Sequence, residues 1–242
     1  MVTQPGGQNI CGITIGVLSL ESYFPKPPGH IKNPSSLGFT VMYEMLDGIT
    51  VPELLGNPTG EMKDRLITAA KRLEAKGARA ITGSCGFLAL FQAEISAAVS
   101  VPVFVSALIQ VPMVHHMTQA PVGVLTASAA SLTDAHLRGV GAANIPIVVQ
   151  GLDDTDEFAT VILRNERTEM DLDKVTEELL QAGRSLIERA PDIGAIVLEC
   201  TDLPPYAWRL QQELGLPVFD LTTLSEMMAT AVLRQPYSGF IS

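Results

Sequence analysis

Short apolar runs alternate along the chain with longer segments in which apolar residues recur every three or four positions. The first run, at residues 13–20, is almost continuously apolar, which is typical of a strand buried on both faces of a parallel sheet. Similar runs recur to the last part of the chain. We predict strands within residues 13–20, 39–46, 78–87, 101–105, 121–126, 145–150, 194–202 and 216–219.

The segments between these runs have helical periodicity. In residues 59–76, for example, Met62, Leu66 and Leu73 follow a helical spacing, and Gly77 is placed to end the helix. Strands that alternate with helices predict parallel sheets joined by right-handed crossovers, so the predicted class is α/β. Further helices are predicted within residues 86–99, 110–120, 127–138, 157–164, 172–189, 204–214 and 222–233.

This pattern occurs twice. A strand that ends in a turn with Cys85 is followed by VPVF, and a strand that ends in a turn with Cys200 is followed by LPVF. Pro102 and Pro217 each follow the corresponding cysteine by 17 residues. The repeat predicts two pseudo-symmetric doubly wound parallel-sheet domains with the active site in the cleft between them. Their expected bounds are residues 1–115 with 221–242 for the first domain and 116–220 for the second.

Composition and charge narrow the possible functions. The 242 residues are 47% hydrophobic and 17% charged, which is typical of an ordered globular protein. A net charge of −10 disfavours binding to nucleic acid or to an anionic membrane, because both need clustered Lys and Arg. Only local positive charge can serve a small anionic substrate in such a chain. We expect no membrane span, with a homo-oligomer as the default for a soluble enzyme.

The sequence gives no support for a cofactor or a metal. It contains neither a P-loop motif nor a strand-linked GxGxxG motif, so we expect no nucleotide cofactor. Three scattered cysteines are typical of a reducing compartment, so we expect a cytoplasmic protein, with Cys11 packed at the start of the first strand. The histidines lack the helical pairing of metal ligands, and no metal site is predicted. They are His30, His115, His116 and His136.

Cys85 and Cys200 are the predicted catalytic residues. Each ends a strand of a parallel sheet, where ligands collect, and the helix that begins behind Cys85 should favour its thiolate. If a twofold axis relates the two halves, the cysteines approach one ligand from opposite sides. One thiolate could then remove a proton from a carbon while the opposite thiol delivers a proton to the other face, which inverts the stereocentre. A Cys85–Cys200 disulfide is the alternative.

Three motifs resemble the aspartate/glutamate racemase superfamily: GSCGFLA from Gly83, VGVLTASAAS from Val122 and LECTDLP from Leu198. The resemblance spans most of the chain and implies two similar α/β domains and a cofactor-independent isomerase. Cys85 and Cys200 match the acid/base pair of that family. The implied activity is racemisation of an amino acid or related small carboxylate, by two-cysteine proton transfer at the carbon next to the carboxylate.

The same resemblance implies substrate-binding residues around the strand ends. Hydroxyl groups and backbone amides there could hold the carboxylate oxygens, on which negative charge develops. Glutamate racemases usually carry Asn-Thr where this chain has Gly86-Phe87, and His where it has Asp202. Phe87 could instead line the pocket, and Asp202 can cap the helix that follows. The predicted substrate-binding residues are Ser19, Asn33, Ser84, Gly86, Phe87, Thr126, Ser128 and Thr201.

Other activities fit the same residues. A decarboxylase of this superfamily needs only one of the two cysteines, and a cis-trans isomerase uses the pair to attack a double bond. A non-catalytic small-ligand-binding protein with the same two-domain shape is a further alternative. The sequence leaves the substrate open among aspartate, glutamate, a hydantoin and other small acids.

Overall fold

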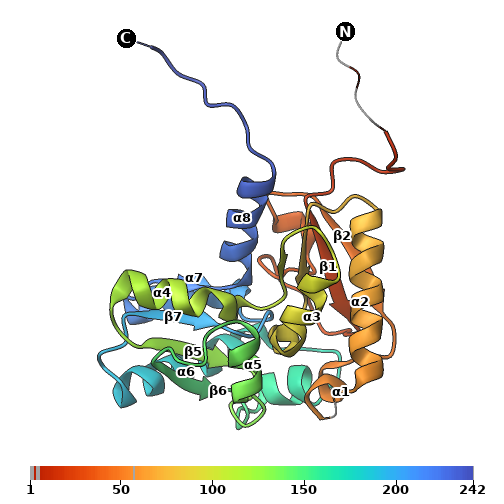
Figure 1. Cartoon of the computed structure of the whole chain (residues 1–242). Coiled ribbons are helices and arrows are strands. Elements are labelled where there is room, and N and C mark those ends of the chain that lie inside the picture. The colour runs from red at the N-terminus through yellow and green to blue at the C-terminus, as the bar shows by residue number, and fades with distance from the viewer. Residues whose placement is uncertain (1–2, 4–5, 57, 242) are drawn as a thin grey trace.

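The computed structural model describes residues 3, 6–56 and 58–241. It contains two parallel four-stranded sheets, one for each half of the repeat, with the orders β2-β1-β3-β4 and β6-β5-β7-β8 (Figure 1). The shared order confirms the predicted α/β class with two doubly wound halves. The strands are β1 (Ile15–Leu20), β2 (Val41–Leu46), β3 (Ala80–Gly83), β4 (Val103–Phe104), β5 (Val122–Thr126), β6 (Ile147–Gly151), β7 (Ala195–Leu198) and β8 (Val218–Phe219).

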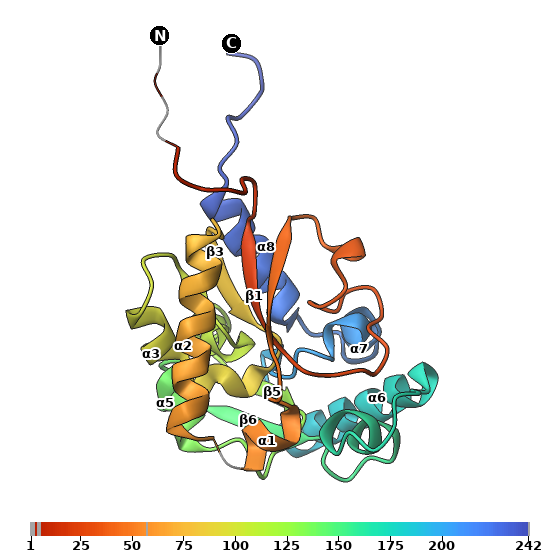
Figure 2. The ribbon, with the colours of Figure 1, turned by 90° about the vertical axis from the view of Figure 1, so that its right-hand side faces the viewer.

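Helices pack along both sheets (Figure 2). In the first half α2 (Gly60–Ala75) contacts β1 and β2, and in the second half α6 (Leu172–Arg189) contacts β5 and β6. The other α-helices are α1 (Val51–Gly56), α3 (Gln92–Ala97), α4 (Val111–Thr118), α5 (Asp134–Gly139), α7 (Ala207–Leu214) and α8 (Leu221–Val232). Short 3-10 segments are η1 (Pro34–Ser36), η2 (Gly86–Phe91), η3 (Ala107–Gln110) and η5 (Pro204–Tyr206), and η4 (Ala159–Leu163) is a π-helical turn.

The central strand β1 and helix α2 form as their sequences predict. Every residue of β1 is buried, and the strand pairs with β2 on one side and β3 on the other. Thr59 caps α2 by accepting a hydrogen bond from Met62 N. Gly77 follows the helix with a φ of 95°, a left-handed conformation that glycine adopts without strain.

The carboxyl ends of β3 and β7 position the two cysteines. Ser84 N donates to Leu18 O, and Glu199 N donates to Leu125 O. Each turn therefore continues the pairing with the central strand of its sheet by one residue before the cysteine. The sheets thus fix where both cysteine turns begin, as expected for a site at strand ends.

The connection after the central strand of each sheet crosses to the other half. The connection after β1 brings Gly29 against η5, where a Cβ would lie 3.3 Å from Pro205 Cα. The connection after β5 contains α5, which packs on η2, and a Cβ at Gly139 would lie 2.2 Å from Ala89 O. Glycine permits both approaches, so each half contributes a wall to the cysteine turn of the other.

The structure departs from the sequence prediction in several segments. The helix predicted at residues 86–99 begins as the 3-10 segment η2 and becomes α-helical only in α3. The segment 127–138 is helical only from Asp134, because Ser128 Oγ and Ala129 N are held by the Asp153 carboxylate. Cys11 is exposed instead of packed, because it precedes the first residue of β1.

The closing helix α8 returns to the first half of the chain. It contacts β3, and its Leu221 and Leu224 join a buried cluster that includes Ile15 and Val17 of β1. The same cluster contains residues of β5 and β7, so both sheets share it. The predicted domain bounds stay a prediction, although α8 packs where the first domain was expected to receive it.

Candidate active site

The two cysteine turns lie against each other. Thr201 Oγ1 donates to Ser84 O at 2.7 Å. Gly86 packs so closely on the other turn that a Cβ there would lie 2.2 Å from Glu199 O. Ser84 therefore faces Thr201, and Gly86 faces Glu199. The two turns thus run in opposite directions, and each has its cysteine as the central residue.

Cys85 and Cys200 are free thiols, each 6% exposed and each part of the same buried apolar cluster. Burial raises the pKa of both thiols, and the carboxyl groups of Glu199 and Asp202 raise it further. The backbone N–H groups of Phe87 and Asp202 face the sulfurs and offset only part of this effect. The predicted preference of Cys85 for the thiolate is therefore wrong, because burial and two carboxyl groups outweigh the helix terminus.

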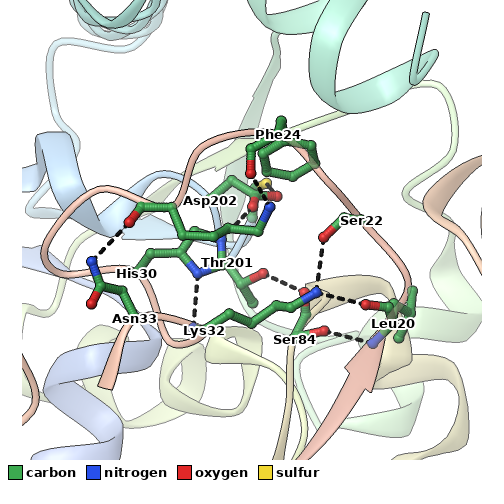
Figure 3. A network of polar contacts seen from close by, with 11 residues as sticks. Leu20, Ser22, Phe24, His30, Lys32, Asn33, Ser84, Thr201 and Asp202 are labelled. Atoms are coloured by element: carbon green, nitrogen blue, oxygen red, sulfur yellow. Dashed lines mark hydrogen bonds and ion pairs between the residues drawn. The ribbon is translucent and has the colours of Figure 1, made fainter. Parts of the chain in front are cut away.

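Asp202 joins Cys200 to a histidine from the other half. Cys200 Sγ donates to Asp202 Oδ2 at 3.4 Å, and His30 Nε2 lies 2.6 Å from Asp202 Oδ1 (Figure 3). His30 Nδ1 accepts from Lys32 N, so we assign the ring proton to Nε2, from which it is donated to the carboxylate. Burial alone would raise the pKa of Asp202, but His30 and Lys26 lower it. Asp202 is thus not the helix cap that the sequence suggested.

The proline-rich loop after β1 brings positive charge to the site. Lys32 Nζ donates to Leu20 O at 2.7 Å and to Ser22 Oγ at 2.9 Å (Figure 3). The ammonium of Lys26 lies 3.4 Å from the centroid of the Phe24 ring, and burial lowers the pKa of Lys26 to about 8. Burial lowers the pKa of Lys32 as well, and the negative charge of Asp202 offsets part of this effect at both lysines. The loop can therefore attract an anion.

Glu199 is a fully buried carboxyl group beside Cys200. Its Oε2 accepts from Thr126 Oγ1 at 2.8 Å. Its Oε1 lies under Gly86 and has no hydrogen-bond partner among the residues that the structure describes. Burial raises the pKa of Glu199 to about 7, against the hydrogen bond from Thr126, which lowers it. Glu199 therefore gains or loses a proton near neutral pH.

The predicted hydroxyl residues of the second half all donate their protons within the protein. Thr126 and Thr201 donate to the partners described above, and Ser128 Oγ donates to Asp153 Oδ1 at 2.5 Å. These bonds fasten the strand ends to each other. Substrate binding by the three hydroxyls stays a prediction.

Three further predicted binding residues differ in their surroundings. Ser84 Oγ accepts from Leu20 N at 2.9 Å, which ties the turn to the end of β1. Asn33 Nδ2 donates to Lys26 O at 2.8 Å, so this amide shapes the loop (Figure 3). Ser19 Oγ is buried and has no hydrogen-bond partner in the described part of the chain. Ser84 and Asn33 therefore hold the turn and the loop in place, whereas Ser19 makes no such bond within the described residues.

Gly86 and Phe87 shape the first turn with no polar side-chain group. Gly86 is in contact with Glu199, and Phe87 is 1% exposed. The Phe87 ring meets the ring of His136 edge to face, with 5.3 Å between the centroids. Phe87 thus links the first cysteine turn to helix α5 of the other half.

The buried charged groups were missed by sequence reasoning. Glu199 interrupts an otherwise apolar strand end, and a carboxyl group within such a run is the signal that could have identified it. His30 and Asp202 are 172 residues apart in the chain. No local pattern connects them, because their contact depends on the crossing of the loop to the other half.

Three features of the described residues bear on other kinds of site. Within residues 3, 6–56 and 58–241, no group of three or more His, Cys, Asp and Glu side chains is placed to hold a metal ion. None of the helices described is both long enough and apolar enough to cross a membrane. A surface hollow of about 630 Å³ between residues 37–40 and α8 contains none of the predicted site residues.

The sequence is similar to a known family and to curated proteins. Residues 111–228 match the model of the Asp/Glu/hydantoin racemase family. The chain is 31% identical over 239 residues to dimethylsulfoniopropionate lyase 3 of Emiliania huxleyi, which covers 93% of this chain and 61% of that protein. It is 30% identical over 238 residues to dimethylsulfoniopropionate lyase 7 of the same organism, which covers 93% and 69%. The chain thus spans less than two thirds of the first of these relatives.

Solved structures with the same fold include a decarboxylase and a racemase. Unliganded arylmalonate decarboxylase superposes with a TM-score of 0.62 at 16% identity, covering 91% of this chain and 92% of that chain. A glutamate racemase from Bacillus anthracis superposes with a TM-score of 0.61 at 18% identity, covering 92% and 82%. At these identities the similarity shows the fold alone.

Proposed function

The chain belongs to the aspartate/glutamate racemase superfamily of enzymes, and we propose that it is a lyase within it. The proposed reaction removes a proton from the carbon next to a carboxylate and expels a leaving group from the following carbon. The substrate class is a small β-sulfonio carboxylate such as dimethylsulfoniopropionate. Support for this substrate comes from the dimethylsulfoniopropionate lyases at 30–31% identity over 93% of the chain. The relatives are lyases, so the expected isomerase stays a prediction.

The elimination needs one base. The Cys85 thiol first loses its proton to solvent, and the resulting thiolate takes the proton from the α-carbon. The electron pair of that C–H bond forms the C=C bond, and the C–S bond breaks with its pair on sulfur. Dimethyl sulfide leaves as a neutral molecule and acrylate remains, so no second proton donor is required. Cys85 is again a thiol at the end of the step.

The hydrogen bond from Cys200 to Asp202 is the observation that carries this proposal. It directs the Cys200 proton toward a carboxylate, 3.4 Å away, instead of toward the opposite sulfur. A site that removes a proton on one face and withholds one on the other favours expulsion of a leaving group over return of a proton. An elimination uses that arrangement, whereas stereoinversion requires the Cys200 proton to leave Asp202.

The charges of the site suit a zwitterion of this kind. The substrate carries one carboxylate and one sulfonium, and the site holds Lys26 and Lys32 together with Asp202 and Glu199. We assign the substrate carboxylate to Lys26, because Phe24 O is the one acceptor that its ammonium contacts among the residues described. The Lys26 ammonium would stabilise the negative charge that develops, during proton removal, on the oxygens of a carboxylate bound beside it.

Racemisation of a small amino acid or carboxylate is the second candidate. The observation in its favour is the equivalent placement of Cys85 and Cys200 at the centre of two facing turns. A two-base racemase needs a proton acceptor on one face and a donor on the other. The two candidates share the first step and differ in whether Cys200 supplies a proton.

The test compares both reactions in wild-type protein and in Cys85→Ser, Cys200→Ser and, as a control, Cys11→Ser. Dimethyl sulfide in the headspace and acrylate in solution report elimination. Deuterium at the α-carbon of D- and L-amino acids in D₂O reports racemisation. For the lyase we expect that Cys85→Ser abolishes release of dimethyl sulfide and Cys200→Ser retains part of it. Loss of dimethyl sulfide release in both variants, together with α-deuteration of an amino acid by the wild type, would favour the racemase. Absence of both reactions in the wild type would refute the proposal.

A further inference from the structure

The two cysteine turns are equivalent in geometry and different in chemistry. In each, the residue two positions after the cysteine contacts a histidine from the other half. Phe87 meets His136, with 5.3 Å between the ring centroids, and Asp202 meets His30, with 2.6 Å between Oδ1 and Nε2. The first turn carries a phenyl ring at this position, whereas the second carries a hydrogen-bond acceptor for its cysteine.

Both histidines are held in the same way. His30 Nδ1 accepts from Lys32 N at 2.9 Å, and His136 Nδ1 accepts from Thr133 N at 3.2 Å. Each ring therefore carries its proton on Nε2. The His136 ring packs edge to face with the hydrocarbon ring of Phe87. At His30 the Nε2 proton is donated to a carboxylate, which fixes the orientation of Asp202 and leaves Oδ2 for Cys200.

We propose that Asp202, held by His30, is a positioning residue that retains the proton of Cys200 and thereby makes Cys85 the base. This inference rests on the proposed function, since it assigns roles within the cysteine pair. A carboxylate acceptor stabilises the thiol over the thiolate of Cys200, whereas Phe87 offers no such acceptor to Cys85. The difference between Asp202 and Phe87 breaks the symmetry of the two turns.

Other charged groups around Cys200 act on the same equilibrium. Glu199 and Cys85 favour the thiol of Cys200, as Asp202 does. From the loop, Lys26 and Lys32 interact with the Asp202 carboxylate and weaken its hold on a proton. Tyr206 on η5 has its own pKa raised, first by burial and then by the charge of Asp202. Of these groups Asp202 alone is hydrogen bonded to the Cys200 sulfur.

The test measures the ionisation of Cys200 directly. In a Cys11→Ser/Cys85→Ser background, Cys200 is the sole cysteine, and its rate of alkylation by iodoacetamide is followed from pH 6 to pH 11. Asp202→Asn is expected to move the midpoint of this profile down by about one pH unit or more, a tenfold gain in thiolate at neutral pH. His30→Ala is expected not to lower the midpoint. The Asp202 carboxylate remains in that variant and loses His30, the donor that competes with the Cys200 thiol for it.

The midpoint separates this role from a merely structural one. Greater access to the site would raise the alkylation rate at every pH without moving the midpoint, and His30→Gln should restore the wild-type profile. Equal midpoints in the wild type and Asp202→Asn, or a downward shift in both Asp202 and His30 variants, would overturn the proposal.

A second measurement uses the full set of cysteines. With dimethylsulfoniopropionate in D₂O, Asp202→Asn is expected to raise the ratio of α-deuterated substrate to dimethyl sulfide, because the Cys200 proton becomes free to return to the carbanion. An unchanged ratio with active enzyme would count against the role of Asp202. If the wild type acted on no substrate, the proposed function would fail while the alkylation profile would still decide the role of Asp202.

Discussion

Replacement of Glu199 by Gln should change how the free energy of unfolding depends on pH. In the folded chain burial raises the pKa of Glu199 to about 7, from its ordinary value of 4.5. Between these values the folded chain holds a proton that the unfolded chain has released. The free energy of unfolding of the wild type therefore falls as pH rises from 4.5 to about 7, and it reaches a lower plateau above that range.

The pKa difference sets the size of the effect. A shift of about 2.5 units corresponds to about 3 kcal/mol between the two plateaus. Glutamine keeps the acceptor for Thr126 and cannot ionise, so the Glu199→Gln variant lacks this fall. Between pH 4.5 and pH 8, the free energy of unfolding of the variant should therefore increase by about 3 kcal/mol relative to that of the wild type.

Urea unfolding at half-unit steps of pH measures this difference. The free energies of unfolding of the wild type and Glu199→Gln are compared at each pH, and Glu177→Gln on the exposed face of α6 controls for loss of one negative charge. Curves for the wild type and Glu199→Gln that stay parallel across this range would show that Glu199 does not take up a proton on folding. The account of the buried carboxyl group would then be wrong.

Three further predictions follow from the same contacts. Gly86→Ala should destabilise the fold by about 2 kcal/mol or more and reduce activity, because its Cβ would lie 2.2 Å from Glu199 O, whereas Gly60→Ala, in open space on α2, should be neutral or stabilising in urea unfolding. Thr126→Val removes a donor that lowers the pKa of Glu199, so the fall in stability should extend above pH 7. Lys26→Met should raise KM for the sulfonio carboxylate, and wild-type KM should rise as pH passes about 8, where Lys26 loses its charge.

The sheets and the cysteine pair could be predicted because their signals are local. Buried strands such as β1 and β7 need continuous apolar runs, and these runs locate the strand ends. The repeat then predicts that Cys85 and Cys200 occupy equivalent turns. The matching strand orders of the two sheets confirm that equivalence, because Cys85 follows β3 and Cys200 follows β7.

The electrostatics of the site could not be predicted because they depend on distant residues. The helix terminus behind Cys85 favours a thiolate, but burial and Glu199 reverse the direction of its pKa shift. Asp202 has the local pattern of a helix cap, and its actual partner, His30, comes from a loop in the other half. The 3-10 geometry of η2 could not be predicted either, because η2 packs on α5, which lies far from it in the chain.

The crossing connections have a consequence for exchanging parts between relatives. Because Gly29 packs on Pro205 and His30 binds Asp202, the loop after β1 and the segment 199–206 form one unit whose pieces lie far apart in the chain. A chimaera that takes one piece from a relative and keeps the other joins surfaces that were selected with different partners. Transplanting both segments together preserves the fit, so the natural module for engineering this enzyme is discontinuous in sequence.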